Sequence, residues 1–347
     1  MQKVKAVVEL ENIRQNAEVF TALAGKPLCA VVKANAYGHG GAEVASALSG
    51  VASMFAVALL EEGIELRYAS CNKDILVFTP PLDEEETYLF CLHELITTIP
   101  DFRTAKLLSA VCRKYKTTIR VHLKVNVGMN RYGMNGSMLG KVCTFLRETP
   151  WVRVEGIYGH LSANTPLEAE AERLRFLRME SIAKRYFPNL IAHLGATYGA
   201  LLGDKYAFDM IRVGLGLYGY LPRTTLSETL SISLKKAMTV YAKRVFSRRY
   251  AFGNAGYGKG EVERGEYLSV CRFGYADGFL RKKENGVKGY EKQVNSLCMD
   301  VSLRRERGEQ GKWIPIMTDA DEVARVTDTI SYEVLCAVTR RAEFIYK

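Results

Sequence analysis

Eight short apolar segments, each separated from the next by a longer stretch, constrain the fold of this chain more than any other feature. They cover residues 27–33, 53–59, 75–79, 95–99, 117–126, 153–160, 190–196 and 208–213. Stretches between them, such as DFRTAKLLSAVCRKY and EAEAERLRFLRMESIAKRYF, repeat apolar residues at the three- and four-residue spacing of an amphipathic helix. Strands that alternate with helices form parallel sheets. The count of eight predicts a (β/α)8 TIM-type barrel over residues 12–222, with an open doubly wound sheet as the alternative.

The pattern changes after residue 222. Segments such as LSISLKKAMTVYAKRVF and GEYLSVCRFGYADGF alternate apolar and polar residues and are bounded by Gly, Asn and charged turns. This alternation is typical of half-buried strands, so we expect a mainly β C-terminal domain over residues 223–347. The opening segment, residues 1–11, is available to this domain because it precedes the first helix and has no place in the barrel.

Composition argues against several classes of protein. The net charge of +10 is dispersed, and no aromatic-basic interleaving accompanies it, so we expect no nucleic-acid binding. Neither a membrane span nor a secretory signal is visible, which predicts a cytoplasmic chain, or the cytoplasmic domain of a longer protein, without membrane contact of its own. The eight cysteines include no CxxC pair and no zinc-ligand spacing, so neither a disulfide framework nor a metal site is expected.

Active-site groups of such a barrel come from the C-terminal ends of its strands. Five of these ends carry polar or ionisable residues, namely Lys33, Lys124 with Arg131, His160, Thr197 and Arg212. Lys33 closes the apolar run LCAVVK, so we expect its amine to be desolvated. Desolvation lowers the pKa of a lysine and frees its neutral amine for Schiff-base chemistry with an aldehyde. A lysine that only extends its amine to water from a strand end is the alternative.

The loops after the last two strands of a barrel often bind phosphate. Here they offer the hydroxyl of Thr197 and the backbone N–H groups of RVGLGLYG, which includes Gly214. A reactive lysine on the first strand and a phosphate cradle on the last two suit pyridoxal phosphate, because this cofactor carries both an aldehyde and a phosphate.

Five motifs are AVVKANAYGHG, KVNVGMNRYGM, DMIRVGLGLYG, CRFGYADGF and SLCMD. They resemble those of the alanine racemase family, whose members are barrel-fold amino-acid racemases that use pyridoxal phosphate. The resemblance extends from VELENIRQN to SYEVLCAVTRRAEFIY and so covers essentially the whole chain. It implies that Lys33 holds the cofactor and serves one face of the substrate α-carbon. Tyr257, in NAGYGKG, would serve the opposite face from the other subunit of a homodimer. Racemisation needs two such groups, because one removes the proton and the other returns it from the far side.

The resemblance also assigns supporting roles. Arg212 would face the pyridine nitrogen and leave it unprotonated, because an arginine does not give up its own proton. His160 would hydrogen-bond this arginine, and Arg131 would contact the cofactor's phenolic oxygen and the substrate carboxylate. Lys124 matches a lysine that is often carbamylated and then pairs with Arg131. The remaining assignments are Tyr37, Thr197, Gly214 and Tyr332 around the phosphate, Met299 at the substrate carboxylate and Tyr275 at the site entrance.

Departures from the family pattern bear on the substrate. Asn126 stands where the family usually has aspartate, and Ala196-Thr197 replaces a common Asn-Ser pair. Alanine is the expected substrate, because Tyr332 leaves little room beyond a methyl group; serine is the alternative, because a methyl pocket rejects an added hydroxyl only weakly. A barrel-fold pyridoxal-phosphate decarboxylase is a further alternative, against which Arg212 counts, because those enzymes carry a carboxylate at that position. The implied setting is the supply of D-amino acid for cell-wall precursors.

Overall fold

The computed structural model of the chain consists of two compact units. It describes residues 4–222, 232–257, 262–281, 294, 297–306 and 311–347. One unit comprises Ile13–Ala34 and Val44–Leu234, and the other comprises Met1–Asn12, Asn35–Glu43 and Lys235–Lys347. The predicted domain boundary between residues 222 and 223 borders residues 223–231, which lie outside the described residues, and stays a prediction.

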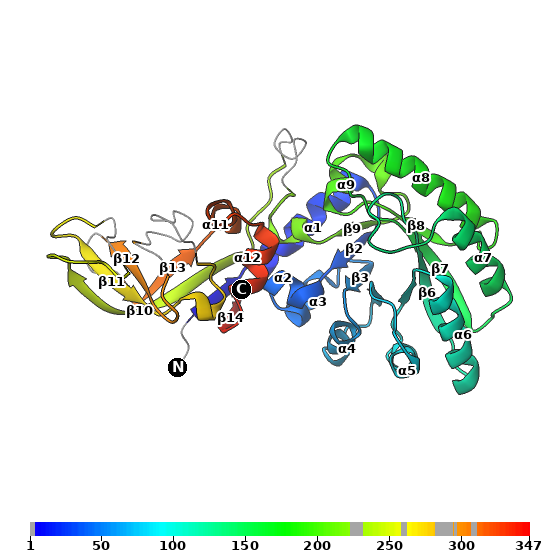
Figure 1. Cartoon of the computed structure of the whole chain (residues 1–347), viewed down its shortest axis with the longest axis horizontal. Helices are drawn as coiled ribbons and strands as arrows, with labels where there is room; N and C mark the ends of the chain where they lie inside the picture. The colour runs from blue at the N-terminus through cyan, green and yellow to red at the C-terminus, as the bar shows by residue number, and fades with distance from the viewer. Residues whose placement is uncertain (1–3, 223–231, 258–261, 282–293, 295–296, 307–310) are drawn as a thin grey trace. The chain divides into compact units, whose positions relative to one another are not determined.

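The first unit is built on eight parallel strands (Figure 1). These are β2 (Leu28–Val31), β3 (Met54–Val57), β4 (Asp74–Val77), β5 (Thr97–Ile99), β6 (Ile119–Lys124), β7 (Val152–Tyr158), β8 (Ile191–His193) and β9 (Ile211–Val213). They pair in the orders β4-β3-β2-β9 and β5-β6-β7-β8. A parallel bridge between Leu76 and Ile96 joins β4 to β5, and the hydrogen bond from Arg212 N to Gly195 O joins the segments of β8 and β9. The strands thus close into a ring, and the predicted (β/α)8 barrel is confirmed.

Helices connect these strands and surround them. They are α1 (Leu10–Ala24), α3 (Gly41–Leu48), α4 (Leu60–Tyr68), α5 (Glu84–Leu92), α6 (Phe102–Tyr115), α7 (Gly136–Arg147), α8 (Pro166–Lys184) and α9 (Thr197–Leu201), with the 3-10 turns η1 (Asp204–Tyr206) and η2 (Leu215–Tyr218). In α6 the predicted spacing places Ala105, Leu108 and Cys112 on one buried face. The Asp101 carboxylate accepts a hydrogen bond from Thr104 N (2.7 Å), which caps the helix where its first N–H groups lack partners.

The second unit is mainly β, as predicted. Its strands are β1 (Val4–Val8), β10 (Met238–Arg249), β11 (Tyr267–Cys271), β12 (Ser302–Glu306), β13 (Trp313–Met317) and β14 (Ala342–Tyr346), and its helical segments are η3 (Tyr275–Asp277), α11 (Ala320–Thr327) and α12 (Ser331–Ala337). The sheet order is β12-β11-β10-β1-β14, with β13 on β10. The opening strand β1 lies antiparallel to β10 and parallel to β14, and its alternating residues are buried. The first strand of the chain therefore contributes to the sheet formed by the last hundred residues.

Candidate active site

Arg212, on β9, lies inside the barrel and is 2% exposed. One terminal nitrogen of its guanidinium donates to His193 Nδ1 (3.0 Å) and His193 O (2.9 Å). The other donates to Gly159 O (2.8 Å) and Leu194 O (3.1 Å). Burial lowers the pKa of Arg212, but arginine starts so high that it keeps its proton. All four acceptors are neutral, so within the described residues this buried cation has no carboxylate partner.

Two histidines that the sequence analysis did not select complete this arrangement. His193 ends β8, and its Nε2 lies 2.8 Å from Nδ1 of His122 on β6. Both rings are fully buried, and burial lowers the pKa of each histidine, so both are neutral. The sequence signal was a histidine inside each of two apolar strand segments, VHLKV and IAHLG. A histidine in an apolar strand is equally consistent with a core residue whose hydrogen bonds are all made. For this reason the sequence analysis did not select His122 and His193.

The hydrogen bond that the resemblance implied between His160 and Arg212 stays a prediction. Among the described residues, the histidine that hydrogen-bonds Arg212 is His193, because it ends the strand segment next to β9, whereas His160 lies two residues beyond β7. His160 nevertheless lies among the cations of the site. Burial, followed by the charges of Arg212, Lys124, Arg131 and Lys33, lowers its pKa to about 3. This electrostatic environment shows that the barrel gathers these four strand-end cations around one histidine.

Lys124, the last residue of β6, is 5% exposed. Its ammonium donates to Val125 O (2.8 Å) and lies 5.1 Å from the centre of the Tyr158 ring. Burial, followed by the charges of Arg212 and Arg131, lowers the pKa of Lys124 to about 7. A large part of this lysine is therefore neutral near pH 7 and is able to act as a nucleophile.

Arg131 and Asn126 belong to the loop after β6. Arg131 is exposed, and its guanidinium carbon lies 5.8 Å from the centre of the Tyr132 ring. Asn126 Oδ1 accepts hydrogen bonds from Gly128 N and Asn130 N, each at 3.1 Å. An aspartate would accept these two bonds but would not make the bond that Asn126 Nδ2 donates to Asn130 Oδ1 (2.7 Å). Asn126 also removes a negative charge from a site rich in cations.

Lys33 begins α2 (Lys33–Gly38), a left-handed turn in which Ala34 to Tyr37 have φ values of 52–53°. This conformation is unfavourable for residues with a Cβ, so it needs compensating contacts. Ala34 N donates to Glu62 Oε1 (2.5 Å), and His39 Nδ1 donates to the carbonyl oxygens of Ala36 and Tyr37 (3.1 Å each). Lys33 itself is half-buried, so the predicted desolvation of its side chain is partial.

Thr197 and Gly214 lie at the starts of α9 and η2. Thr197 is 5% exposed, and its hydroxyl oxygen accepts a hydrogen bond from Gly216 N (3.4 Å). Gly214 directly precedes η2. The segments after β8 and β9 are therefore linked to each other and offer a hydroxyl with nearby backbone N–H groups, the donor types that bind phosphate.

The other predicted residues belong to the C-terminal unit. The rings of Tyr37 and Tyr332 lie 5.9 Å apart, and burial raises the pKa of Tyr332. Tyr257, Met299 and Tyr275 are exposed, by 70%, 54% and 42%. The candidate residues thus form two sets, one in each unit.

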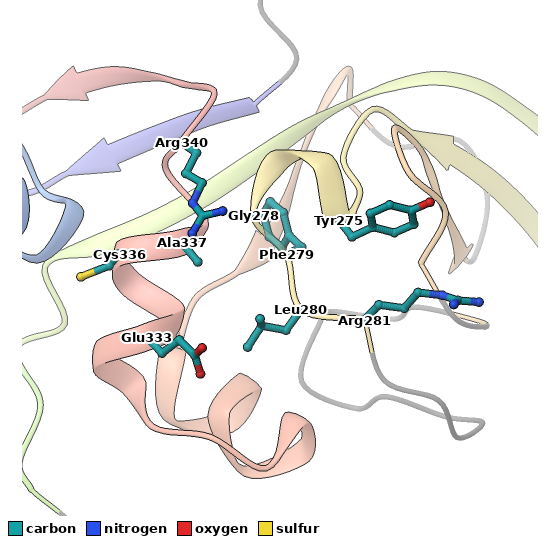
Figure 2. Close-up of a pocket in the computed structure, with 9 residues that line it drawn as sticks. All are labelled: Tyr275, Gly278, Phe279, Leu280, Arg281, Glu333, Cys336, Ala337 and Arg340. Carbon is teal, nitrogen blue, oxygen red and sulfur yellow. The ribbon is translucent and has the colours of Figure 1, made fainter.

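Tyr275 and Met299 are held together by backbone contacts. Tyr275 N donates to Cys298 O (3.2 Å) and Ala276 N donates to Met299 O (3.0 Å). A Cβ at Gly274 would lie 2.3 Å from Cys298 O, so only glycine permits this approach. Tyr275 also lines a pocket of about 350 Å³ between the η3 segment and α12 (Figure 2). Figure 2 shows Arg281 and Glu333 among its other lining residues.

Within the described residues, no group of His, Cys, Asp and Glu side chains is arranged to hold a metal ion. None of the described helices is both long and apolar enough to cross a membrane.

Comparisons with known proteins cover both units. Residues 8–222 match the family model of the alanine racemase N-terminal domain, and residues 237–346 match that of the C-terminal domain. Alanine racemase 1 of Bacillus subtilis is 32% identical over 361 residues, covering 97% of this chain and 91% of the relative. The alanine racemase of Synechocystis sp. is 32% identical over 368 residues, covering 98% of each.

Solved structures agree with these matches. The biosynthetic alanine racemase from Pseudomonas aeruginosa superimposes with a TM-score of 0.85 at 28% identity over 100% of both chains. The alanine racemase from Bartonella henselae, which contains covalently bound pyridoxal phosphate, has a TM-score of 0.84 and, at 22% identity, shares the fold. On the family models and the full-length relatives, this chain belongs to the alanine racemase family.

Proposed function

We propose that this protein interconverts L- and D-alanine with pyridoxal phosphate as its cofactor. The observation that carries the proposal is the environment of Arg212 in a chain that matches alanine racemases over nearly its full length. Four N–H groups of its guanidinium donate to neutral acceptors, which leaves the Nε–H for a further partner. This donor on a buried side chain would fit an unprotonated ring nitrogen, which accepts a hydrogen bond and needs no counter-charge.

The residues present fit the rest of the cofactor as well. Lys33 would bind it covalently through its amine. The phosphate would be held by Thr197, Gly214, Tyr37 and Tyr332, and Arg131 and His160 would lie at the ring. Bound pyridoxal phosphate supplies an electron-accepting ring that stabilises negative charge on the substrate α-carbon.

Two proton-transfer groups would act on opposite faces of the substrate. The Lys33 amine would remove or return the α-proton on one face, and the Tyr257 hydroxyl would do so on the other. A single group would return the proton to the face from which it came, so inversion requires both. We propose that Tyr257 serves the barrel of a second copy in a homodimer, and the 70% exposure of its side chain supports this role.

The loop after β6 would orient the substrate. Arg131 would bind the substrate carboxylate together with the backbone of Met299, and Tyr275 would lie at the entrance. The pKa of Lys124, about 7, leaves much of its amine in the neutral form that attacks carbon dioxide. The new N–C bond forms with loss of one amine proton to water, and the resulting carbamate anion would pair with Arg131.

Alanine is the proposed substrate because the full-length relatives named above are alanine racemases. Serine stays the alternative, because a pocket that accepts a methyl group rejects an added hydroxyl only weakly. Ala196-Thr197, in place of the common Asn-Ser pair, also departs from the family pattern. A decarboxylase is disfavoured by Arg212, which stands where those enzymes carry a carboxylate. We further propose a cytoplasmic role in supplying D-alanine for cell-wall precursors.

A chiral assay of the purified protein with pyridoxal phosphate tests the proposal. L-alanine and L-serine would be supplied separately at matched concentrations. We expect D-alanine to form faster than D-serine. A preference for serine would replace the substrate but keep the mechanism. The absence of any D product from protein that binds the cofactor would overturn the proposed function.

A further inference from the structure

We propose that His122 and His193 act as a positioning pair for Arg212. In this arrangement His122 keeps the proton of His193 on Nε2, and His193 Nδ1 therefore remains an acceptor for the guanidinium. The inference rests on the proposed function, because Arg212 is the residue assigned there to the cofactor ring nitrogen.

The proton positions follow from the chemistry of the donors. A guanidinium only donates hydrogen bonds, so His193 Nδ1, at 3.0 Å from the Arg212 terminal nitrogen, must be unprotonated. A neutral imidazole then carries its proton on Nε2, which lies 2.8 Å from His122 Nδ1. His122 Nδ1 must accept that proton's hydrogen bond, so His122 in turn carries its own proton on Nε2. Each N–H in this series of hydrogen bonds, from Arg212 through His193 to His122, therefore points away from Arg212.

The last donor of this hydrogen-bonded series, the Nε2–H of His122, is in an energetically unfavourable place. His122 Nε2 is buried and has no hydrogen-bond partner among the described residues. A buried N–H without an acceptor costs stability, and an apolar side chain at the same place would avoid that cost. The unpaired donor therefore indicates that His122 is present for what its other nitrogen does.

The surrounding residues hold the two rings in place. The ring of Tyr158 stacks on His193 at 5.2 Å between centres, with 16° between the planes. A Cβ at Gly156 would lie 2.7 Å from the His122 ring, so glycine at this position leaves room for the ring. The pair is thus built into the barrel by packing as well as by hydrogen bonds.

Loss of the acceptor on His122 would release the proton of His193. With a proton on Nδ1, His193 would oppose the Arg212 N–H instead of accepting from it, and the guanidinium would lose one of its four anchors. Because Arg212 is positioned by these anchors, the effect would reach the group that it binds. Loss of the hydrogen-bond partner of a metal ligand typically costs about tenfold or more in activity, and we expect a loss of similar size here.

Two variants of similar size distinguish the effect of the hydrogen-bond acceptor at position 122 from the effect of side-chain packing. His122→Asn keeps an oxygen acceptor near the Nδ1 position, whereas His122→Leu removes it. We expect His122→Leu to lower kcat about tenfold and His122→Asn to recover most of that loss. Thermal unfolding of each variant establishes that the barrel is folded, and Gly156→Ala, which displaces the intact His122 ring, should reproduce the effect of His122→Leu.

The proton positions are measured directly by nitrogen NMR on protein labelled with ¹⁵N-histidine and free of cofactor. The chain has five histidines, so substitution assigns each signal. We expect His193 to carry its proton on Nε2 in the native protein and in His122→Asn, and to populate the Nδ1-protonated form in His122→Leu. The pair His93→Asn and His93→Leu, at the C-terminal cap of α5, is the control and should leave the His193 signals unchanged.

A proton on Nδ1 of His193 in the native protein, or equal kcat in His122→Asn and His122→Leu, would overturn the positioning pair. A native protein that makes no D-alanine would instead overturn the proposed function, and the nitrogen signals of the cofactor-free protein would still decide the proton positions.

Discussion

Two pairs of buried charges, one pair in each unit, differ in their partners. In the barrel, Arg212 and Lys124 are buried cations, and neither pairs with a carboxylate in the part of the chain that the structure describes. In the C-terminal unit, buried carboxylates are paired with arginines. Asp277 accepts from Arg341 Nε (2.8 Å), and Glu306 accepts from Arg244 (3.2 Å).

This difference separates structural charge from functional charge. The two charges of a buried ion pair neutralise each other, so the pair needs no charged ligand. A buried cation without a carboxylate keeps a positive potential that an anionic ligand can neutralise, and its pKa is moved toward the working range. The surroundings of Arg212 and Lys124 therefore have the electrostatics that suit an anionic ligand, whereas the ion pairs of Asp277 and Glu306 stabilise the fold of the C-terminal unit.

The largest expected effect lies in the barrel. Lys33→Ala removes the amine that would bind the cofactor and move the α-proton, so racemisation should fall by at least about a thousandfold. The measurement is D-alanine formation under saturating L-alanine and cofactor. Lys141→Ala, on the exposed face of α7, is the control and should retain full activity. Substantial activity in Lys33→Ala would show that a residue other than Lys33 is the reactive group.

The next effect tests what the C-terminal unit contributes. Tyr257→Phe should lower kcat/KM by about a hundredfold, and equally in both directions, because the equilibrium constant between the enantiomers is 1. The directions should differ in the α-deuterium isotope effect, which should be large where position 257 faces the proton that is removed and small in the opposite direction. Rates with α-deuterated L- and D-alanine measure both isotope effects, and equal isotope effects with a mild loss of rate would contradict the assignment.

A mixture of subunits tests whether the site is shared. Lys33→Ala protein combined with Tyr257→Phe protein should regain activity, because mixed dimers contain one site with both native groups. No recovery after verified subunit exchange would show that Lys33 and Tyr257 do not act across subunits.

A smaller effect distinguishes the paired charges from the unpaired ones. Arg341→Ala leaves Asp277, which is 1% exposed, without its arginine and should lower the free energy of unfolding. Chemical denaturation measures this loss, and Arg340→Ala, at the neighbouring exposed position, should change it little. An unaltered stability in Arg341→Ala would mean that water replaces the arginine.

The smallest effect concerns Lys124 and has a defined pH dependence. Its folded-state pKa, about 7, lies below the ordinary lysine value of 10.5, so between these pH values the unfolded chain binds more protons. Stability therefore rises with pH across this window, and the cost of burying the charge is fully present below about pH 7. Lys124→Met removes that cost and should stabilise the cofactor-free protein more at pH 6.5 than at pH 10.

Denaturation in buffers free of carbon dioxide gives this difference without interference from carbamylation. Lys141→Met, which alters an exposed lysine, provides the baseline. A pH-independent difference between Lys124→Met and the native protein would show that Lys124 keeps an ordinary lysine pKa.

The barrel was predictable from the sequence because strand and helix periods are local. Each of the eight predicted apolar segments overlaps one strand, and the ends of parallel strands meet on one rim, which led to Lys33, Lys124, His160 and Arg212. The alternation in β10 and β11 predicted the second unit for the same reason. Side-chain period alone decides which face of an element is buried.

Other features depended on the closed fold. His122, His193 and Arg212 lie on β6, β8 and β9, and no sequence spacing predicts that their rings and guanidinium meet. The left-handed turn after Lys33 has no local signal beyond Gly38, because Ala34 to Tyr37 are ordinary residues held there by contacts such as that with Glu62.

The sequence by itself determined which residue types stand at the strand ends and which segments form the barrel and the sheet. Only the tertiary structure decided which of the buried charges have partners. Periodicity is a property of neighbouring residues, whereas desolvation and hydrogen bonding depend on atoms that distant segments bring within a few ångströms of each other.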